Sequence, residues 1–117
     1  MDANRKTAYL TLKDVEDKKA YSNLALNHKI ALNKPNSPAF VRELVYGVLE
    51  NELTLDYYID LLVRDGIDSL KQAELNIIRM GIYQLGYMNS VPEYAAVNES
   101  VILAKRYARG KAGLVNG

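Results

Sequence analysis

The apolar residues of this chain recur at spacings of three and four, and this period limits its fold more than any other feature. The segment "NSPAFVRELVYGVLENEL" shows the period most clearly. It carries one wide apolar stripe, formed by Phe40, Val41, Leu44, Val45, Val48 and Leu49. Side chains spaced in this way share one face of an α-helix, whereas a half-buried strand alternates at every second residue. Ser37 is a suitable N-cap and Pro38 suits the first helical position, so a helix is predicted to begin there.

The same period predicts five further helices. They cover residues 4–19, a segment capped by Ser22 and running to about residue 32, a segment capped by Thr54 and ended by Gly66, about 70–88, and about 94–108, ended by Gly110. No alternating strand pattern occurs, so we predict an all-α fold. Within the helices, Gly47 and Gly81 each cost about 1 kcal/mol relative to alanine, and we interpret them as points of close helix approach.

The inward faces of the last three helices follow from the same spacing. The first is expected to point Leu55, Tyr58, Ile59, Leu62 and Val63 inward, and the second carries Leu75, Ile78, Ile82 and Leu85 at spacings of three and four. The third is expected to bury Ala96, Val97, Ser100, Val101, Leu103, Ala104, Tyr107 and Ala108. Asn98 and Glu99 fall on its other face, partly covered, and we interpret them as a brace to the segment after Gly110, with Glu99 orienting Arg106.

The composition excludes several kinds of functional site. The chain has no cysteine, which removes disulfides, thiolate metal sites and thiol nucleophiles. The one histidine, His28, is expected to lie on a helix flank without a chemical role. Asp56 and Asp60 form an i, i+4 pair that could bind a metal ion, but such a pair is usually the solvated face of an amphipathic helix. We therefore predict no catalytic and no metal-binding residue.

The overall composition is that of a globular domain. The chain has 117 residues, of which 49% are hydrophobic and 25% charged, which suits one folded domain. No apolar run approaches the ~18 residues needed to cross a bilayer, and the N-terminus lacks the apolar centre of a signal peptide. We therefore expect a cytoplasmic protein with no membrane partner.

Basic residues gather in two places, although the net charge is only +1. The run "KRYARGK", residues 105–111, has four basic residues and no acidic one, and Arg5-Lys6 opens the first helix. Cations favour the negative end of a helix dipole whatever the partner, so a solvated helix end and a phosphate-binding patch both fit the run. Tyr107 within it is a candidate for base stacking, with core packing as the alternative.

Four segments together resemble the NusB-type domain, and most closely the N-terminal domain of the RsmB (Sun) methyltransferases. They are "AYSNLALN" at 20–27, "ELVYGVLENELTLDYYI" at 43–59, "IIRMGIYQLGYMNSVPEYAAVNESVILAKR" at 77–106 and "GLVNG" at 113–117. The last two are the most specific, because "YQL", the Val-Pro turn, "AVNE" and "VNG" come in the family's order and spacing. Enzymes of this family methylate carbon 5 of a cytosine in the 16S, small-subunit ribosomal RNA.

The resemblance implies a bundle of six to seven helices in two packed three-helix groups, with a last helix that begins at "VNG" and is truncated. It implies that residues 1–117 are one RNA-binding domain of a longer enzyme. The absent catalytic domain of that enzyme would bind S-adenosylmethionine and supply a nucleophilic cysteine. Because this chain has no cysteine and no readable strand–turn–helix unit, we expect it to be catalytically inert alone and to bind no cofactor.

The function implied by the resemblance is the positioning of ribosomal RNA. The residues predicted to contact its phosphates are Arg5, Lys6, Lys105, Arg106, Arg109 and Lys111. One alternative is standalone NusB, a transcription antitermination factor that binds RNA together with a ribosomal protein. The other is a protein-docking module that packs on its own C-terminal catalytic domain, or whose exposed apolar surface makes it a homodimer.

Overall fold

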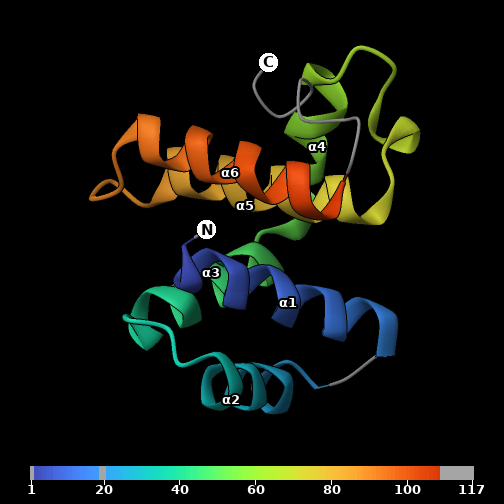
Figure 1. Ribbon diagram of the computed structural model, residues 1–117. Helices are drawn as coiled ribbons and strands as arrows, with labels where there is room; N and C mark the ends of the chain where they lie inside the picture. The colour runs from blue at the N-terminus through green and yellow to red at the C-terminus, as the bar shows by residue number, and fades with distance from the viewer. Residues whose placement is uncertain (1, 19–20, 109–117) are drawn as a thin grey trace.

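The computed structural model describes residues 2–18 and 21–108, and all regular structure in these ranges is helical. The elements are α1 (Ala3–Lys18), α2 (Ser22–Asn33), α3 (Pro38–Glu50), α4 (Glu52–Leu62), the short 3₁₀ helix η1 (Ile67–Ser69), α5 (Gln72–Tyr87) and α6 (Glu93–Tyr107). Figure 1 shows α1, α2 and α3 in one group and α4, α5 and α6 in a second group packed on it. The predicted all-α fold with two three-helix groups is thereby confirmed, whereas the predicted last helix at "VNG" lies outside the described residues.

The start of α3 follows the sequence prediction, and the starts of two other helices do not. The Ser37 side chain accepts a hydrogen bond from the Phe40 amide at 3.2 Å, and Pro38 is the first helical residue. The predicted cap Ser22 is wrong: it is the first residue of α2, and Tyr21 in extended conformation precedes it. Thr54 is also wrong as a cap, because α4 begins at Glu52.

A single residue joins the two helix groups. Asn51 ends α3 and begins α4, with φ −111° and ψ 17°. Its side-chain amide donates to the Gly47 carbonyl at 2.8 Å and so satisfies an acceptor at the end of α3. Because α3 supplies the carbonyl that holds this corner, α4 starts two residues before the predicted cap.

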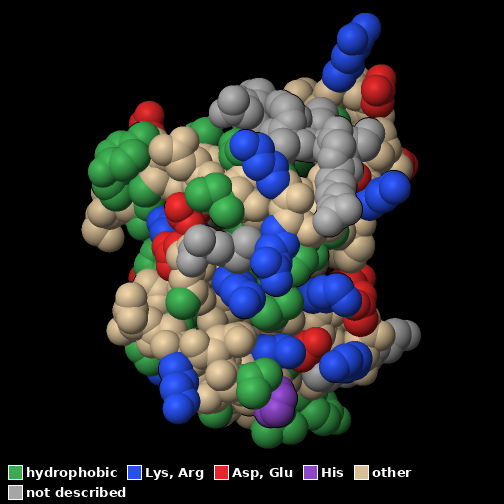
Figure 2. All heavy atoms as spheres, in the orientation of Figure 1, with side chains coloured by type: hydrophobic (Ala, Val, Ile, Leu, Met, Phe, Trp, Pro, Cys, Tyr) green, Lys and Arg blue, Asp and Glu red, His purple; other side chains and the backbone are tan. Residues whose placement is uncertain are grey.

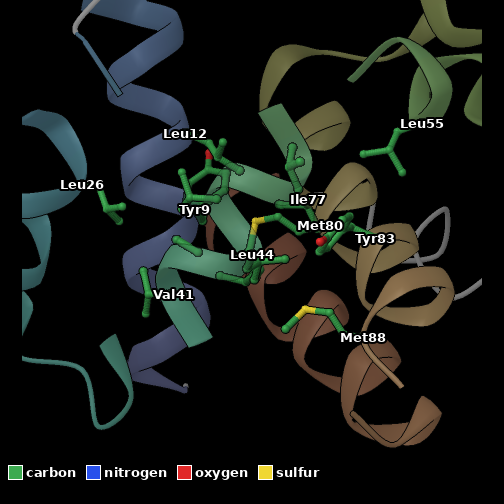
Figure 3. Close-up of a cluster of buried hydrophobic side chains, with 14 of the residues drawn as sticks. Tyr9, Leu12, Leu26, Val41, Leu44, Leu55, Ile77, Met80, Tyr83 and Met88 are labelled. Carbon is green, nitrogen blue, oxygen red and sulfur yellow. The ribbon is translucent and has the colours of Figure 1, made fainter. Parts of the chain in front are cut away.

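The hydrophobic core lies where α1 and α3 meet α5. Figure 3 shows side chains from these helices converging there, with Leu26 of α2 and Leu55 of α4 at its two sides. Nearly complete burial is shared by Tyr9, Leu12, Leu26, Val41, Leu44, Leu55, Ile77 and Met80. Burying a side chain of this size contributes about 1.5–3 kcal/mol, so this cluster dominates the packing energy between the two groups.

The apolar row of α5 that the sequence shows is only partly buried. Leu85 is 48% exposed, and Leu75 and Ile78 are only half-buried, whereas Ile77, Met80 and Tyr83 point into the core. Helix α5 contacts α1, α3, α4 and α6, so several of its faces are covered. It therefore also buries Glu74, Asn76, Arg79 and Gln84, which hydrophobicity alone assigns to solvent.

The predicted inward face is only partly correct for α4 and is confirmed for α6. Leu55 and Ile59 of α4 are buried as predicted, but Tyr58 is 50% and Leu62 75% exposed. Helix α4 also ends at Leu62 rather than Gly66, which has φ +81° and precedes η1.

On α6 the predicted face is confirmed: Ala96, Ser100, Leu103, Ala104 and Ala108 are buried, and Val97, Val101 and Tyr107 half-buried. The predicted stop at Gly110 lies outside the described residues.

Both mid-helix glycines are points of close approach, as predicted. A Cβ atom on Gly47 would lie 2.0 Å from Cζ of Tyr83, so the ring of α5 occupies the space that a side chain would need. A Cβ atom on Gly81 would lie 3.0 Å from Oγ of Ser100 on α6. The two glycines therefore fix how closely α5 packs on α3 and on α6.

Candidate nucleic-acid interface

Helices α1 and α6 belong to different helix groups, run in roughly the same direction and are joined by two contacts (Figure 1). The backbone amide of Asp2 donates to Oε1 of Glu99 at 3.1 Å, and the rings of Tyr9 and Tyr107 stack with centroids 4.5 Å apart. Tyr9 follows Asp2 by seven residues and Tyr107 follows Glu99 by eight, so the two helices run in the same direction here. We call this line of contact the α1–α6 seam.

The seam brings together predicted cations from both ends of the sequence. Lys6 lies between Asp2 and Tyr9 on the face of α1 that contacts α6, because it is four residues from one and three from the other. Arg106 adjoins Tyr107, and its guanidinium carbon is 5.6 Å from the centroid of that ring. Lys105 is exposed as well, but it precedes Tyr107 by two residues and so lies on the side of α6 that faces away from α1. Figure 2 shows Lys and Arg side chains gathered over α1 and toward α6.

These cations are not neutralised by neighbouring acids. Within residues 2–18 and 21–108, Lys6, Lys105 and Arg106 form no ion pair with a carboxylate. Glu99 also lies at the seam, where its Oε1 accepts a hydrogen bond from the Asp2 amide, and its negative charge offsets part of the positive charge there. The seam and the adjoining surface of α6 therefore present positive charge to solvent near the C-terminal end of α6, from Lys105 and Arg106, and on α1, from Lys6.

Arg5 does not belong to this surface. Its side chain is buried, and its Nε donates to Oε1 of Gln84 at 2.7 Å. Its Nη1 also pairs with the Asp2 carboxylate, and the guanidinium lies 5.0 Å from the centroid of the Phe40 ring. Arg5 thus links α1 to α3 and α5, and the expectation that it extends an exposed patch is not met.

Lys13 is a seam residue that sequence reasoning missed. It lies one turn beyond Tyr9 on the same face of α1, and 52% of its side chain is exposed. Its Nζ is 2.5 Å from the Asp17 carboxylate, whose hydrogen bond and charge raise the pKa of Lys13. Its spacing from Tyr9 identifies it only once Tyr9 is known to contact α6. Because Asp17 neutralises Lys13, Lys13 adds less to the positive electrostatic potential of the seam than the unpaired cations do.

The structure describes Tyr107 but not the last two predicted cations. Arg109 and Lys111 lie outside the described residues. Tyr107 is half-buried, with Tyr9 stacked on its ring and Arg106 beside it, which is packing rather than a free face for a base. Burial raises the pKa of Tyr9, so this partner of the stack stays protonated at neutral pH. Base stacking on Tyr107 stays a prediction.

The Asn98–Glu99 pair is arranged differently from the prediction. Asn98 is exposed, so the expected partial cover is wrong. Glu99 does form a brace, but to the start of α1 through the Asp2 amide. The segment after Gly110, to which the brace was predicted, lies outside the described residues.

The aspartates of α4 have structural partners. Asp56 accepts two hydrogen bonds from Arg79, from Nε and Nη2, each at 2.7 Å, and Glu52 lies 3.1 Å from Nη2. Asp60 accepts from the Ile67 amide at 2.9 Å. This pair therefore ties α4 to α5 and η1. Across the described ranges, no group of three or more His, Asp or Glu side chains is placed to hold a metal ion.

The one histidine of the chain lies where it was expected. His28 is exposed on α2, as predicted. None of the described helices is long and apolar enough to cross a membrane.

The sequence matches the model of the NusB family over residues 2–117. It is 38% identical to a probable ribosomal RNA small subunit methyltransferase B of Synechocystis sp., covering 100% of this chain and 27% of that protein. A protein of the same name from Bacillus subtilis is 34% identical, over 97% and 26%. The transcription antitermination protein NusB of Bacillus licheniformis is 34% identical, over 97% of this chain and 88% of its own length. The chain thus spans about a quarter of its methyltransferase relatives.

A solved structure shares the fold. A chain of the "Crystal Structure of a Plectonemic RNA Supercoil" superposes with a TM-score of 0.87, covering 99% of this chain and 88% of that chain. The two sequences are 24% identical, so this likeness concerns the arrangement of the helices.

Proposed function

Because the chain belongs to the NusB family, we propose that it binds RNA through the α1–α6 seam and positions ribosomal RNA for a methyltransferase. The observation that carries the proposal is that Lys6 and Arg106 lie at the seam and Lys105 is exposed on the adjoining surface of α6, with no carboxylate ion pair to any of the three among the described residues. The substrate is inferred from the two relatives named as small-subunit ribosomal RNA methyltransferases.

The chemistry of these side chains suits a phosphate backbone. Lysine offers a mobile point charge, and the guanidinium of arginine offers a planar fork that matches two phosphate oxygens. Such contacts give affinity and set the register of the RNA but carry little sequence choice. The seam would therefore hold an RNA segment in place, and selection of the target base would occur elsewhere.

Methyl transfer itself is assigned to another part of the enzyme in this proposal. A catalytic domain outside this chain would bind S-adenosylmethionine and supply the nucleophile. The helical domain would contribute orientation of the RNA, which raises the rate by holding the target base near the methyl donor.

The proposal is tested by measuring binding to small-subunit ribosomal RNA fragments by fluorescence anisotropy over a series of salt concentrations. Replacing Lys6, Lys105 and Arg106 together by Glu should abolish most of the binding at low salt. If these residues neutralise three phosphates, the slope of log K against log salt should fall by about 2–3 in the variant.

The matched control reverses three exposed cations elsewhere, Arg42, Arg64 and Lys71. It changes the net charge by the same amount but leaves the seam intact. Equal loss of binding in both variants would mean that only net charge matters, and the absence of binding by the wild-type chain at low salt would refute the proposal for this domain.

A standalone antitermination factor is the runner-up, favoured by the 88% of the Bacillus licheniformis NusB that the chain covers. The gene sequence beyond codon 117 decides between the two. A reading frame that continues into a catalytic domain with cysteines supports the methyltransferase, and a stop soon after supports the factor.

A protein-docking role is favoured by the outer face of α4. Leu53 is 88%, Tyr57 63% and Leu61 65% exposed, at spacings of one helical turn. A helix with apolar residues on nearly all sides is normally covered. In a longer chain, Leu53→Ser with Leu61→Ser should loosen the domain from its neighbour and speed its release by limited proteolysis.

A further inference from the structure

Helix α2 carries a second apolar face that the proposed function does not use. Tyr21 just before it and Leu24 and Leu32 within it are 78%, 62% and 64% exposed, while α2 buries only Ala25 and Leu26. His28 and Ala31 are exposed between them. We call Tyr21, Leu24, His28, Ala31 and Leu32 the α2 outer row. Figure 2 shows the histidine among hydrophobic side chains over α2.

The spacing of the row is that of a helix-packing surface. From Tyr21 the steps to Leu24, His28 and Ala31 are three, four and three residues, so the side chains form one ridge along the helix. Polar residues Asn23 and Asn27 occupy the other exposed side of α2. An apolar ridge bordered by polar residues on a surface helix indicates an interaction site.

The charge along α2 and the segments that flank it in the sequence is positive. The sequence from Lys18 to Arg42 contains no Asp or Glu. Asp14 of α1 is shared between Lys29, at 3.2 Å, and Lys18, at 3.5 Å, so one carboxylate faces two cations. Lys34, exposed at the end of α2, forms no ion pair with a described carboxylate. The partner that complements this rim is therefore acidic.

We propose that the α2 outer row is a docking surface for an acidic amphipathic helix of a partner protein. Leu24 and Leu32, about two turns apart, would interdigitate with the side chains of another helix, which is how helices bind apolar faces. The row spans about 16 Å along α2, at 1.5 Å per residue, so it fits a partner helix of about three turns. The site is separate from the α1–α6 seam and does not depend on RNA binding.

Other classes of partner fit the row less well. Recognition of single-stranded RNA uses aromatic rings and arginine as stacking platforms, whereas α2 has no arginine and the two aromatic rings of its row, Tyr21 and His28, are seven residues apart. Binding to an anionic membrane surface needs a polar face rich in Lys and Arg, whereas the polar side of α2 carries Asn23 and Asn27. These two partners are therefore tested as competing outcomes.

The test uses a synthetic helical peptide with leucines at a and d positions and glutamates at the flanking positions, titrated into the ¹⁵N-labelled chain. We expect amide shifts confined to residues 21–34. Leu24→Glu with Leu32→Glu should weaken binding at least about tenfold, because two buried leucines are lost. Asn23→Gln with Asn27→Gln, which changes the other side of α2 without adding charge, should retain binding within about threefold.

Fold integrity is checked by circular dichroism, and Leu24→Ala with Leu32→Ala should also lose binding without adding charge. The proposal is overturned if residues 21–34 do not shift, or if a peptide with lysines in place of the glutamates binds equally well. It is also overturned if phosphatidylserine vesicles, a single-stranded RNA oligomer or a second copy of the chain occupy the row in preference to the acidic peptide.

Discussion

At the scale of single residues, the tightest constraint in the molecule is the contact between Gly47 and Tyr83. Alanine at position 47 gains about 1 kcal/mol of helix propensity, but its Cβ atom would overlap the Tyr83 ring, which is itself 8% exposed. We expect Gly47→Ala to lower the free energy of unfolding by about 1–3 kcal/mol, measured by urea denaturation, because overpacking forces the ring out of its position.

The control for this prediction is Gly86, near the end of α5. No atom lies within 4 Å of a Cβ built there, so Gly86→Ala should leave stability unchanged or raise it by about 0.5 kcal/mol. Similar losses in both variants would show that the helix backbone, and not the ring, explains the glycine at position 47.

The sequence predicts that these glycines matter but does not identify their partners. A glycine inside a helical pattern is unusual, which is a local signal. That Tyr83 fills the space, or that Arg5 is buried against Gln84, depends on residues 36 and 79 positions away. For the same reason, a cation at a helix start was expected at the surface and lies inside.

At the scale of helices, α2 ends with a backbone strain that can be relieved. Its C-cap, Lys34, has φ 47° and ψ 58°, and it is the one non-glycine residue with positive φ among those described. This left-handed conformation costs an L-residue roughly 1–2 kcal/mol. The Lys34 amide is held there by its hydrogen bond to the Ile30 carbonyl, at 2.9 Å.

We therefore expect Lys34→Gly to raise the free energy of unfolding by about 0.5–1 kcal/mol and Tm by roughly 2–5 °C, measured by thermal circular dichroism. Lys34→Ala keeps the strain and should give no such gain. If Ala stabilises as much as Gly, the benefit comes from losing the lysine charge instead.

The presence of each helix was predictable, because it depends on the local spacing of apolar residues. Which face of a helix is buried was not always predictable. The face of α6 was predicted well since one side of it is covered. Helix α5 contacts four other helices, so its most hydrophobic row and its most buried row differ. In the seam, Lys6 and Arg106 were predicted from composition, but Lys13 required knowing that Tyr9 faces α6.

At the scale of the whole molecule, an ion pair fastens α2 to the rest of the bundle. Burial acts to raise the pKa of Asp14, but hydrogen bonds and charges from Lys29 and Lys18 outweigh it, and the pKa is lowered. A carboxyl whose pKa is lower in the folded state stabilises the fold above its unfolded pKa of about 3.9. That stabilisation is lost as the pH falls through the folded pKa.

We accordingly expect Asp14→Asn to lower the free energy of unfolding at pH 7 by about 0.5–1 kcal/mol. The difference from the wild type should shrink through the acid range and vanish below the folded pKa, as measured by urea denaturation at a series of pH values. Asp17→Asn, at a pair with Lys13 in which both side chains are about half exposed, should change little. A difference for Asp14→Asn that is independent of pH would contradict the role of the ion pair.

The one-residue corner at Asn51 also has a consequence for synthesis on the ribosome. Helices α1, α2 and α3 emerge before the corner, but the faces of α1 and α3 that form the core are covered by α5, which is complete only at Tyr87. At roughly 5–20 residues per second, the nascent first half waits about 2–7 s with that face uncovered. The growing chain is therefore open to chaperones, or to misassembly with a neighbouring nascent chain, during this interval.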